Sequence, residues 1–161
     1  MKLVQTKIKT SVGNLYLLAS EKGLRGVNLE SWSAETVSNL ESKTPEIKIL
    51  KQAKAELEEY FSGKRKNFEI PLDIEGSAFQ KKVWNQLQKI PYGKTCAYKD
   101  IATKLRDPNA SRAVGTANGK NPLWIVVPCH RVITASGTLG GYAGGLDMKT
   151  KLLQLESNIN E

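Results

Sequence analysis

The sequence has little of what metal clusters and disulfide frameworks require. Its 161 residues include two cysteines, Cys96 and Cys129, and a single histidine, His130. Two cysteines cannot form the several bridges that hold small secreted domains together, and one histidine excludes most histidine-rich metal sites. Neither kind of site is therefore expected.

Long apolar segments are also missing. No apolar run approaches the roughly 20 residues that cross a bilayer, and the N-terminal MKLVQTKIKT lacks the apolar core of a secretory signal. We therefore expect a cytoplasmic chain of bacterial or archaeal type with no membrane partner. The remaining composition, 40% hydrophobic and 25% charged, is that of a globular protein.

Acidic residues are scarce in the second half of the chain. The whole sequence has a formal net charge of +8, of which residues 1–75 contribute +1 and residues 76–161 contribute +7. Such an excess of positive charge favours an anionic partner, most simply nucleic acid. Residues 71–77 contain the Pro, Gly and Ser that are typical of a linker. We therefore expect two domains, residues 1–73 and 74–161.

The first domain has the pattern of a small α+β unit. Residues 3–10, 15–19 and 24–29 are short β-branched or apolar segments separated by turn signals, which predicts an antiparallel meander. A helix follows, between Pro45 and Gly63, with an expected inner face of Ile47, Leu50, Lys54, Leu57 and Phe61. This half contains no reactive motif, so we interpret it as a structural domain.

The second domain is predicted to be mostly helical. Phe79, Val83, Leu87 and Ile90 recur at helical spacing. Two further helices are expected at residues 98–105 and from Ser111, as the N-terminal cap, to about residue 119. Two short helices joined by a tight turn match a helix-turn-helix, although a plain helical hairpin in a core has the same pattern. The charge of this half favours DNA binding.

The most reactive cluster is at residues 128–131. The apolar run of residues 123–127, bounded by prolines, reads as a buried strand that ends at Cys129. The neighbouring His130 and Arg131 would favour its thiolate form. Cys129 and His130 can share a site only if Pro128 ends the strand or a water links them. The alternative is an unreactive buried thiol, which is our interpretation of Cys96.

Five glycines within residues 137–145 predict a loop with unusual backbone angles, after which Asp147 can cap a final helix. Glu156 lies at the edge of the apolar face of this helix. A carboxylate there could orient His130 as in a Cys-His-acid triad. Spacing alone favours the other interpretation, a solvated surface glutamate.

Together these motifs resemble the methylated-DNA–protein-cysteine methyltransferases, the O6-alkylguanine-DNA alkyltransferases. The strings RAVG at 112–115, NP at 121–122, PCHRV at 128–132 and GYAGG at 141–145 occur in that family's order, followed by Lys149 and Glu156. The match is dense over residues 79–156. The resemblance implies an α+β fold, with a small N-terminal antiparallel sheet plus helix (ribonuclease H-like) and a mostly helical C-terminal domain that contains the helix-turn-helix.

The resemblance also implies a mechanism. Cys129 would attack the alkyl carbon on guanine O6 in one displacement and form an irreversible thioether, so that each molecule acts once. His130 would take the thiol proton through a water, and Glu156 would orient the imidazole. Tyr98 would donate a hydrogen bond to guanine N3, and Asn121 would brace the active-site turn.

The implied partner is double-stranded DNA containing O6-alkylguanine, bound through the minor groove by a monomer, with the damaged nucleotide rotated out of the stack. Arg112 would fill the gap that the nucleotide leaves. The other expected DNA contacts are Tyr98, Lys99, Ser111, Ala113 and Lys120, and the expected alkylguanine pocket consists of Val132, Tyr142, Ala143 and Gly144. No metal and no cofactor are implied.

Three other functions fit parts of the pattern. A binding protein that recognises damage without transfer would lack the acceptor cysteine, and Cys129 argues against it. A helix-turn-helix regulator with a sensor cysteine would need a dimer interface or a further DNA-binding domain. A cysteine hydrolase would turn over, whereas an alkyltransferase stops after one equivalent.

Overall fold

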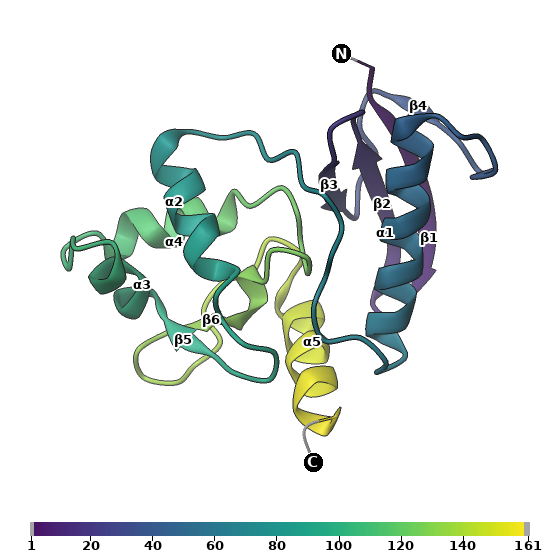
Figure 1. Cartoon of the computed structure of the whole chain (residues 1–161). Helices are drawn as coiled ribbons and strands as arrows, with labels where there is room; N and C mark the ends of the chain where they lie inside the picture. Colours follow the sequence, from purple (N-terminus) through teal and green to yellow (C-terminus); the bar gives the residue numbers. More distant parts are fainter. Residues whose placement is uncertain (1, 160–161) are drawn as a thin grey trace. The chain divides into compact units, whose positions relative to one another are not determined.

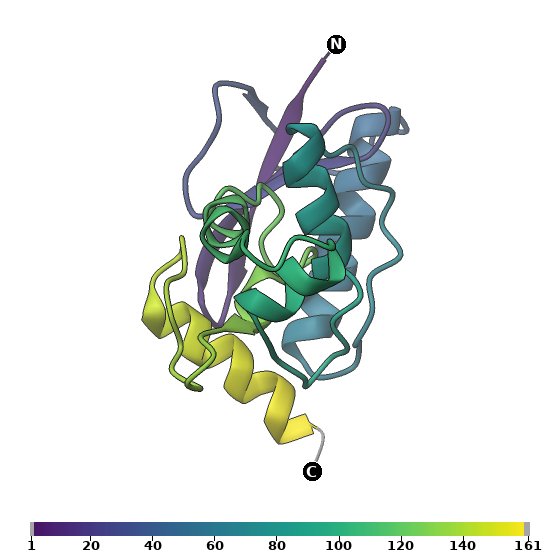
Figure 2. The ribbon, with the colours of Figure 1, turned by 90° about the vertical axis from the view of Figure 1, so that its left-hand side faces the viewer.

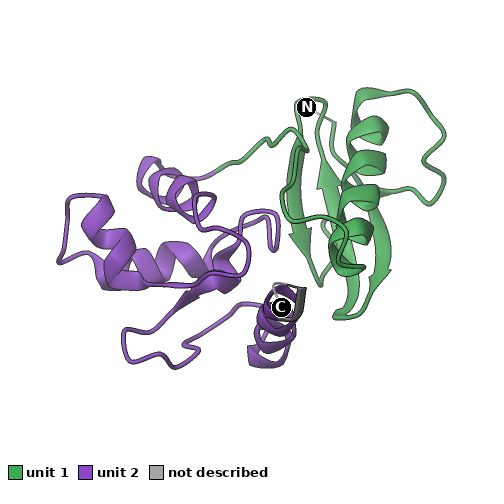
Figure 3. Cartoon of the chain, turned by 60° about the horizontal axis from the view of Figure 1, so that its bottom comes forward, with its two compact units in different colours: residues 1–75 green, residues 76–161 purple. Residues whose placement is uncertain are grey.

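The computed structural model describes residues 2–159 and consists of two compact units, residues 1–75 and 76–161 (Figure 3). The expected α+β class is confirmed: the first unit is a sheet with one helix, and the second is mostly helical. The sequence-based domain boundary between residues 73 and 74 stays a prediction.

The sheet of the first unit has the strand order β3-β2-β1-β4 (Figure 1). β1 (Val4–Thr10), β2 (Gly13–Ala19) and β3 (Leu24–Asn28) form the predicted antiparallel meander, with Val4 opposite Ala19 and Thr10 opposite Gly13. The β1–β2 turn is tight because Gly13 takes a φ of +117°, which is costly for other residues.

The fourth strand is absent from the sequence-based prediction. β4 (Glu35–Thr36) pairs parallel with β1 over two residues. The buried Gln5 side chain holds the segment that leads into it, donating to the carbonyl oxygens of Trp32 (2.8 Å) and Ala34 (3.0 Å). This pairing depends on a side-chain amide, so no hydrophobic period marks it in the sequence.

Helix α1 (Pro45–Phe61) covers the sheet of the first unit. Thr44 caps its N-terminus, and Pro45 occupies the first turn, where a missing N–H costs nothing. The predicted inner face was wrong at two positions. Lys54 is exposed and Phe61 is only half-buried, and their neighbours Ala53 and Tyr60 are fully buried in their place. A lysine at this point keeps its charge in water while alanine allows close packing.

The second unit contains four α-helices among its described residues. They are α2 (Ala78–Leu87), α3 (Tyr98–Lys104), α4 (Ser111–Gly119) and α5 (Leu146–Ile159). The helices α2, α3 and α4 pack together, with α3 and α4 forming the helix-turn-helix, while α5 lies apart from them and contacts residues 129–131 (Figures 1 and 2). Two short parallel strands, β5 (Cys96–Ala97) and β6 (Val132–Ile133), complete the unit.

The predicted strand at residues 123–127 was wrong. These residues are buried, but they wind through turns, with Val126 N–H donating to the Trp124 carbonyl (2.8 Å) and Val127 N–H to the Leu123 carbonyl (2.9 Å). Ile125 has a φ of +75°, which a strand does not permit. An apolar run indicates burial, and here the local hydrogen bonds override the extended form.

Two predicted helix caps were also wrong. Ser111 is the first residue of α4 and Ala110 precedes it, with no side-chain cap hydrogen bond. Asp147 lies inside the first turn of α5, which begins at Leu146. Its charge is favourable there because it faces the positive end of the helix dipole. By contrast α2 has a complete capping box between Ser77 and Gln80.

Candidate active site

Cys129 begins a 3-10 turn that follows the wound apolar segment. The turn, η1 (Cys129–Arg131), leads directly into β6. Cys129 is 3% exposed, and its N–H donates to the carbonyl of Val127 (2.8 Å). The Asn118 amide of α4 donates to the Cys129 carbonyl (3.4 Å). The thiol is therefore held in a fixed, buried position, and the turn takes the place of the expected strand end.

Asn121 fixes the segment before the turn. Its side-chain amide donates to the Val127 carbonyl (2.8 Å), and its side-chain oxygen accepts from Leu123 N–H (3.0 Å). The residue is 4% exposed. One side chain thus closes both ends of the wound segment that precedes Cys129.

Glu156 of α5 binds His130. The Nε2 atom of His130 lies 2.7 Å from Oε2 of Glu156, and both side chains are almost completely buried. The imidazole Nδ1 has no hydrogen-bond partner among residues 2–159. A carboxylate can only accept, so an ionised Glu156 leaves Nε2 as the donor and Nδ1 with a lone pair.

Arg131 binds the same carboxylate. Its Nε donates to Oε1 of Glu156 (2.8 Å) and its Nη2 to Oε2 (3.0 Å), a two-point contact that fixes geometry as well as charge. Its Nη1 donates to the Ile90 carbonyl (2.8 Å), and its guanidinium lies 5.7 Å from the centre of the Tyr92 ring. Burial raises the pKa of Glu156, but the hydrogen bonds from His130 and Arg131 prevail and lower it to about 2.

The free thiol is protonated at neutral pH. Burial raises the pKa of Cys129 to about 11, opposed by the nearby side chains of Asn121, Lys149 and Tyr142. Sequence analysis expected His130 and Arg131 to favour the thiolate. Instead these two side chains are bound to Glu156. Because only the thiolate is a good nucleophile, the site needs a base.

His130 is suited to be that base. Burial lowers its pKa below the usual value, and the charges of Arg131 and Lys149 act in the same direction, while Glu156 opposes them. The ring is therefore neutral near pH 7 and can accept a proton at Nδ1. Cys129 and His130 are consecutive residues of one turn, so the alternation of a strand, which would place their side chains on opposite faces, does not apply.

Lys149 is a buried cation that the sequence analysis did not assign. Its Nζ donates to the carbonyl oxygens of Val132 (2.7 Å), Leu139 and Gly141 (3.1 Å). The residue has no exposed surface. Lysine on a helix normally indicates a solvated face, so only its place in the family motif could have marked it. It joins α5 to β6 and to the first part of the glycine-rich loop.

Tyr98 lies between two glycines. A Cβ atom at Gly115 would lie 3.7 Å from the Tyr98 ring, and one at Gly140 would lie 3.1 Å from its hydroxyl oxygen. Burial raises the pKa of Tyr98, and the charge of a Cys129 thiolate raises it further. Tyr98 thus packs between α4 and the glycine-rich loop.

The predicted pocket residues come from two segments. Tyr142 packs its ring against Trp124, with 5.8 Å between centroids, and its buried hydroxyl lowers the pKa of Cys129. Ala143 is exposed, Gly144 is half-buried, and Val132 is fully buried in β6. The side chain of Tyr142 therefore acts on the Cys129 thiol, whereas Val132 can contribute only its backbone groups to the site.

The helix α4 has one exposed face and one buried face. Val114, Ala117 and Asn118 are buried, and the Ala117 carbonyl accepts from the Trp84 indole (2.8 Å). Ala117 therefore packs in the core. The predicted DNA contacts that are solvent-accessible are Arg112, Ala113, Lys99 and Lys120, with Ser111 and Tyr98 half-buried.

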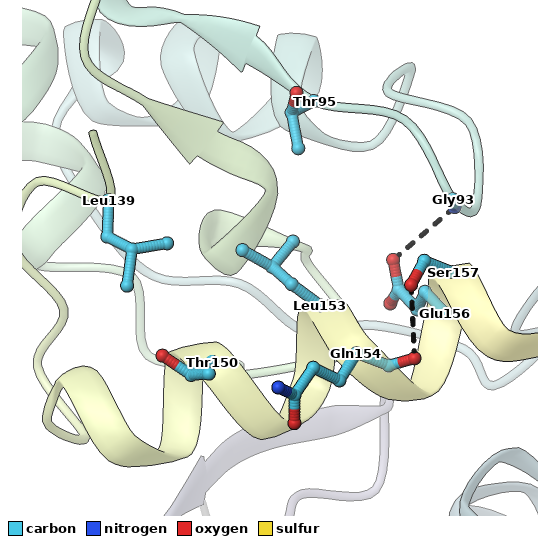
Figure 4. A pocket seen from close by; sticks show the side chains of 8 residues that line it. All are labelled: Gly93, Thr95, Leu139, Thr150, Leu153, Gln154, Glu156 and Ser157. Atoms are coloured by element: carbon cyan, nitrogen blue, oxygen red, sulfur yellow. Dashed lines mark hydrogen bonds between the residues drawn. The ribbon is translucent and has the colours of Figure 1, made fainter. Parts of the chain in front are cut away.

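Glu156 also lines a pocket. A pocket of about 360 Å³ separates α5 (Thr150, Leu153, Gln154 and Ser157) from Gly93, Thr95 and Leu139 (Figure 4). Glu156 lies at its edge, and its Oε1 accepts from Gly93 N–H (3.4 Å). Cys129 and His130 do not line this pocket.

Among residues 2–159, no group of three or more His, Cys, Asp or Glu side chains could hold a metal ion. Within the same range, no helix combines the length and the apolar character that a bilayer span needs.

Two family models match the chain in succession. The ribonuclease-like domain of 6-O-methylguanine DNA methyltransferase matches residues 3–74, and the DNA binding domain of the same family matches residues 78–158. A methylated-DNA–protein-cysteine methyltransferase of Methanosarcina acetivorans is 45% identical over 150 residues, which cover 93% of this chain and 96% of the relative. The constitutive enzyme of that name from Bacillus subtilis is 45% identical over 156 residues, with 94% and 93% covered.

A solved structure agrees with these relatives. Mycobacterium tuberculosis OGT in complex with DNA superposes with a TM-score of 0.86 at 37% sequence identity, and the match covers 97% of this chain and 94% of that one. The similarity extends over both units.

Proposed function

Because the chain belongs to the 6-O-methylguanine DNA methyltransferase family, we propose that Cys129 is the residue that accepts the alkyl group. The activity is that of a methylated-DNA–protein-cysteine methyltransferase, which repairs alkylated DNA by transfer to the protein itself. The observation that carries the proposal is the buried thiol of Cys129, one residue before a histidine whose other nitrogen is bound to Glu156.

The transfer is a single displacement. A bond forms between Sγ of Cys129 and the alkyl carbon as the bond from that carbon to guanine O6 breaks. The electron pair of the broken bond stays on the guanine, which takes up one proton and leaves repaired. Overall, the proton that the thiol loses is balanced by the proton that the base gains. The product is a thioether, which has no leaving group for hydrolysis, so each protein molecule is consumed by one event.

His130 takes the thiol proton at Nδ1, through a water. Glu156 holds Nε2–H and so keeps the lone pair on Nδ1. The need for this relay follows from the raised pKa of Cys129, because an undissociated thiol is a poor nucleophile. Asn121 braces the segment before the turn and Lys149 contributes positive charge near the sulfur.

The guanine occupies the space between Tyr98 and the loop of Tyr142 and Ala143. The Tyr98 hydroxyl donates to guanine N3 as negative charge develops on the base. Backbone N–H groups of Tyr142 and Ala143 stabilise O6, and backbone carbonyls near Cys129 and Val132 accept from the exocyclic amine. The Val132 carbonyl also accepts from Lys149, which fixes its direction.

The protein binds DNA through its second unit, whose family match is the DNA binding domain. We propose that α4 enters the minor groove, where little sequence is read, as a search for damage requires. The exposed Arg112 fills the gap left by the rotated nucleotide, and Ser111, Ala113, Lys99 and Lys120 contact the backbone. The monomeric state and the cytoplasmic location stay predictions.

Mass spectrometry after mixing with an O6-methylguanine oligonucleotide tests the acceptor. We expect one added methyl group, on the peptide that contains Cys129. Cys129→Ala should bind DNA but take up nothing, and Cys96→Ser should take up one methyl group like the parent. Repaired DNA alongside an unmodified Cys129 contradicts the proposal.

A further inference from the structure

The Glu156 carboxylate serves two neighbours in the same turn. His130 and Arg131 are adjacent in η1, and both bind it, His130 through one oxygen and Arg131 through both. The proposed mechanism uses the first of these contacts and gives no task to the second. Arg131 is nonetheless 5% exposed, and burying a guanidinium is costly unless its charge is matched.

Arg131 is held independently of the imidazole. Its Nη1 donates to the Ile90 carbonyl (2.8 Å), and its guanidinium lies against the Tyr92 ring. These contacts fix the guanidinium plane, so that two N–H groups point at Glu156. The orientation of the Arg131 guanidinium toward Glu156 therefore does not depend on the protonation state of His130.

Sharing the carboxylate with Arg131 changes how strongly Glu156 stabilises the protonated form of His130. A buried carboxylate bound by a histidine alone favours the imidazolium, which would leave the ring unable to accept a proton. A carboxylate already neutralised by an arginine still accepts from Nε2–H but stabilises the imidazolium much less.

We propose that Arg131 is a positioning residue of the proton relay: by sharing Glu156 with His130, it holds the imidazole neutral and ready to accept the Cys129 proton. This role of Arg131 rests on the proposed function, because it presupposes that His130 accepts the Cys129 proton during alkyl transfer. The charged groups that act on His130 are Glu156 and Lys149 of α5 and Arg131 itself. The helix α2, which also packs against the turn, buries only Val83, Trp84 and Leu87.

The sequence makes the test direct. His130 is the single histidine of the chain, so its imidazole nitrogens give one set of NMR signals that needs no assignment. In the free wild-type protein at pH 7 we expect a neutral ring with the proton on Nε2. An imidazolium in the wild type at pH 7 overturns the proposal without any variant.

Arg131→Met should raise the midpoint of the His130 titration by about one pH unit or more, because an unshared buried carboxylate now faces the ring. The double variant Arg131→Met with Glu156→Gln should return the ring to the neutral form at pH 7. Lys151→Met is the matched control: it removes one positive charge from an exposed site of α5 and should leave the midpoint unchanged. An unchanged midpoint in a folded Arg131→Met contradicts the proposal.

The rate of methyl transfer gives a second readout. The acid limb of the pH–rate profile of Arg131→Met should move to higher pH together with the His130 midpoint, so that the loss of rate is several-fold greater at pH 6 than at pH 8.5. A purely structural arginine would lower the rate by the same factor at both values. One methyl group taken up by Arg131→Met at pH 8.5 keeps the proposed function intact, whatever the titration shows.

Discussion

Nζ of Lys149 lies 2.7 Å from the carbonyl oxygen of Val132 and also binds the carbonyls of Leu139 and Gly141, so one buried ammonium group joins α5 to β6 and to the first part of the glycine-rich loop. The same charge lowers the pKa of Cys129. One side chain therefore orders the loop of the proposed guanine pocket and favours the reactive form of the sulfur.

Lys149→Met should slow alkyl transfer by about tenfold or more, because the thiol pKa rises and the three carbonyls lose their donor. The rate with a free O6-alkylguanine base and the pH dependence of thiol alkylation by iodoacetamide measure the two effects. Lys151→Met, on the exposed side of the same helix, should react like the parent. The same thiol pKa in Lys149→Met and Lys151→Met would contradict the claim that the Lys149 charge lowers the pKa of Cys129.

Gly140→Ala should also slow transfer. Gly140 has a φ of +70°, and a Cβ there would lie 3.1 Å from the Tyr98 hydroxyl oxygen, which must then shift. The strained backbone adds about 1 kcal/mol or more. Gly141→Ala is a close control, because nothing lies within 4 Å of its Cβ position. A similar rate for both variants would show that the Tyr98 position is not critical.

Arg112→Ala should weaken repair of duplex DNA more than reaction with the free base, because only the duplex has a gap for the side chain to fill. Single-turnover rates on both substrates measure the difference. Lys22→Ala, a lysine in the first unit, should change neither rate. Equal losses on the two substrates by Arg112→Ala would argue against the role in the base stack.

Acid should destabilise the protein partly through Glu156. Its folded-state pKa of about 2 lies below the ordinary value of 4.5, so its stabilising effect is complete above pH 4.5 and is lost as the pH falls toward 2. Glu156→Gln should lower the free energy of unfolding at pH 7 by about 3 kcal/mol, since it breaks a buried ion pair.

Urea unfolding at pH 7 and pH 3 checks this. The difference in stability between the two pH values should be smaller in Glu156→Gln than in the parent. An unchanged difference would mean that the carboxylate is not ionised in the folded protein.

Local patterns predicted most of the elements. The meander, α1 and the helix-turn-helix follow from the spacing of apolar residues and from nearby Pro, Gly and turn residues, all within short segments. The strand predicted at residues 123–127 was wrong because an apolar run indicates burial and not backbone conformation. The backbone there is held by Asn121, a polar residue outside the run.

Within the site, Glu156 shows the limit of local reasoning. Spacing on its helix favours a solvated glutamate, and only the family resemblance marked it as functional. Its burial depends on His130 and Arg131, which lie 26 and 25 residues earlier in the chain. The sequence places Lys149 in the family motif but gives it no role, because its partners are backbone carbonyls that no sequence pattern reveals.

The 3-10 turn η1 has a consequence for protein engineering. With about three residues per turn, its consecutive side chains project in different directions. Cys129 lies near Asn121, Lys149 and Tyr142, while His130 and Arg131 both bind Glu156. The groups around the turn come from α4, α5 and the segments around Asn121 and Tyr142. Inserting the sequence PCHR alone into another protein should therefore give a cysteine without alkyl-acceptor reactivity. An engineered alkyl acceptor would need the whole second unit.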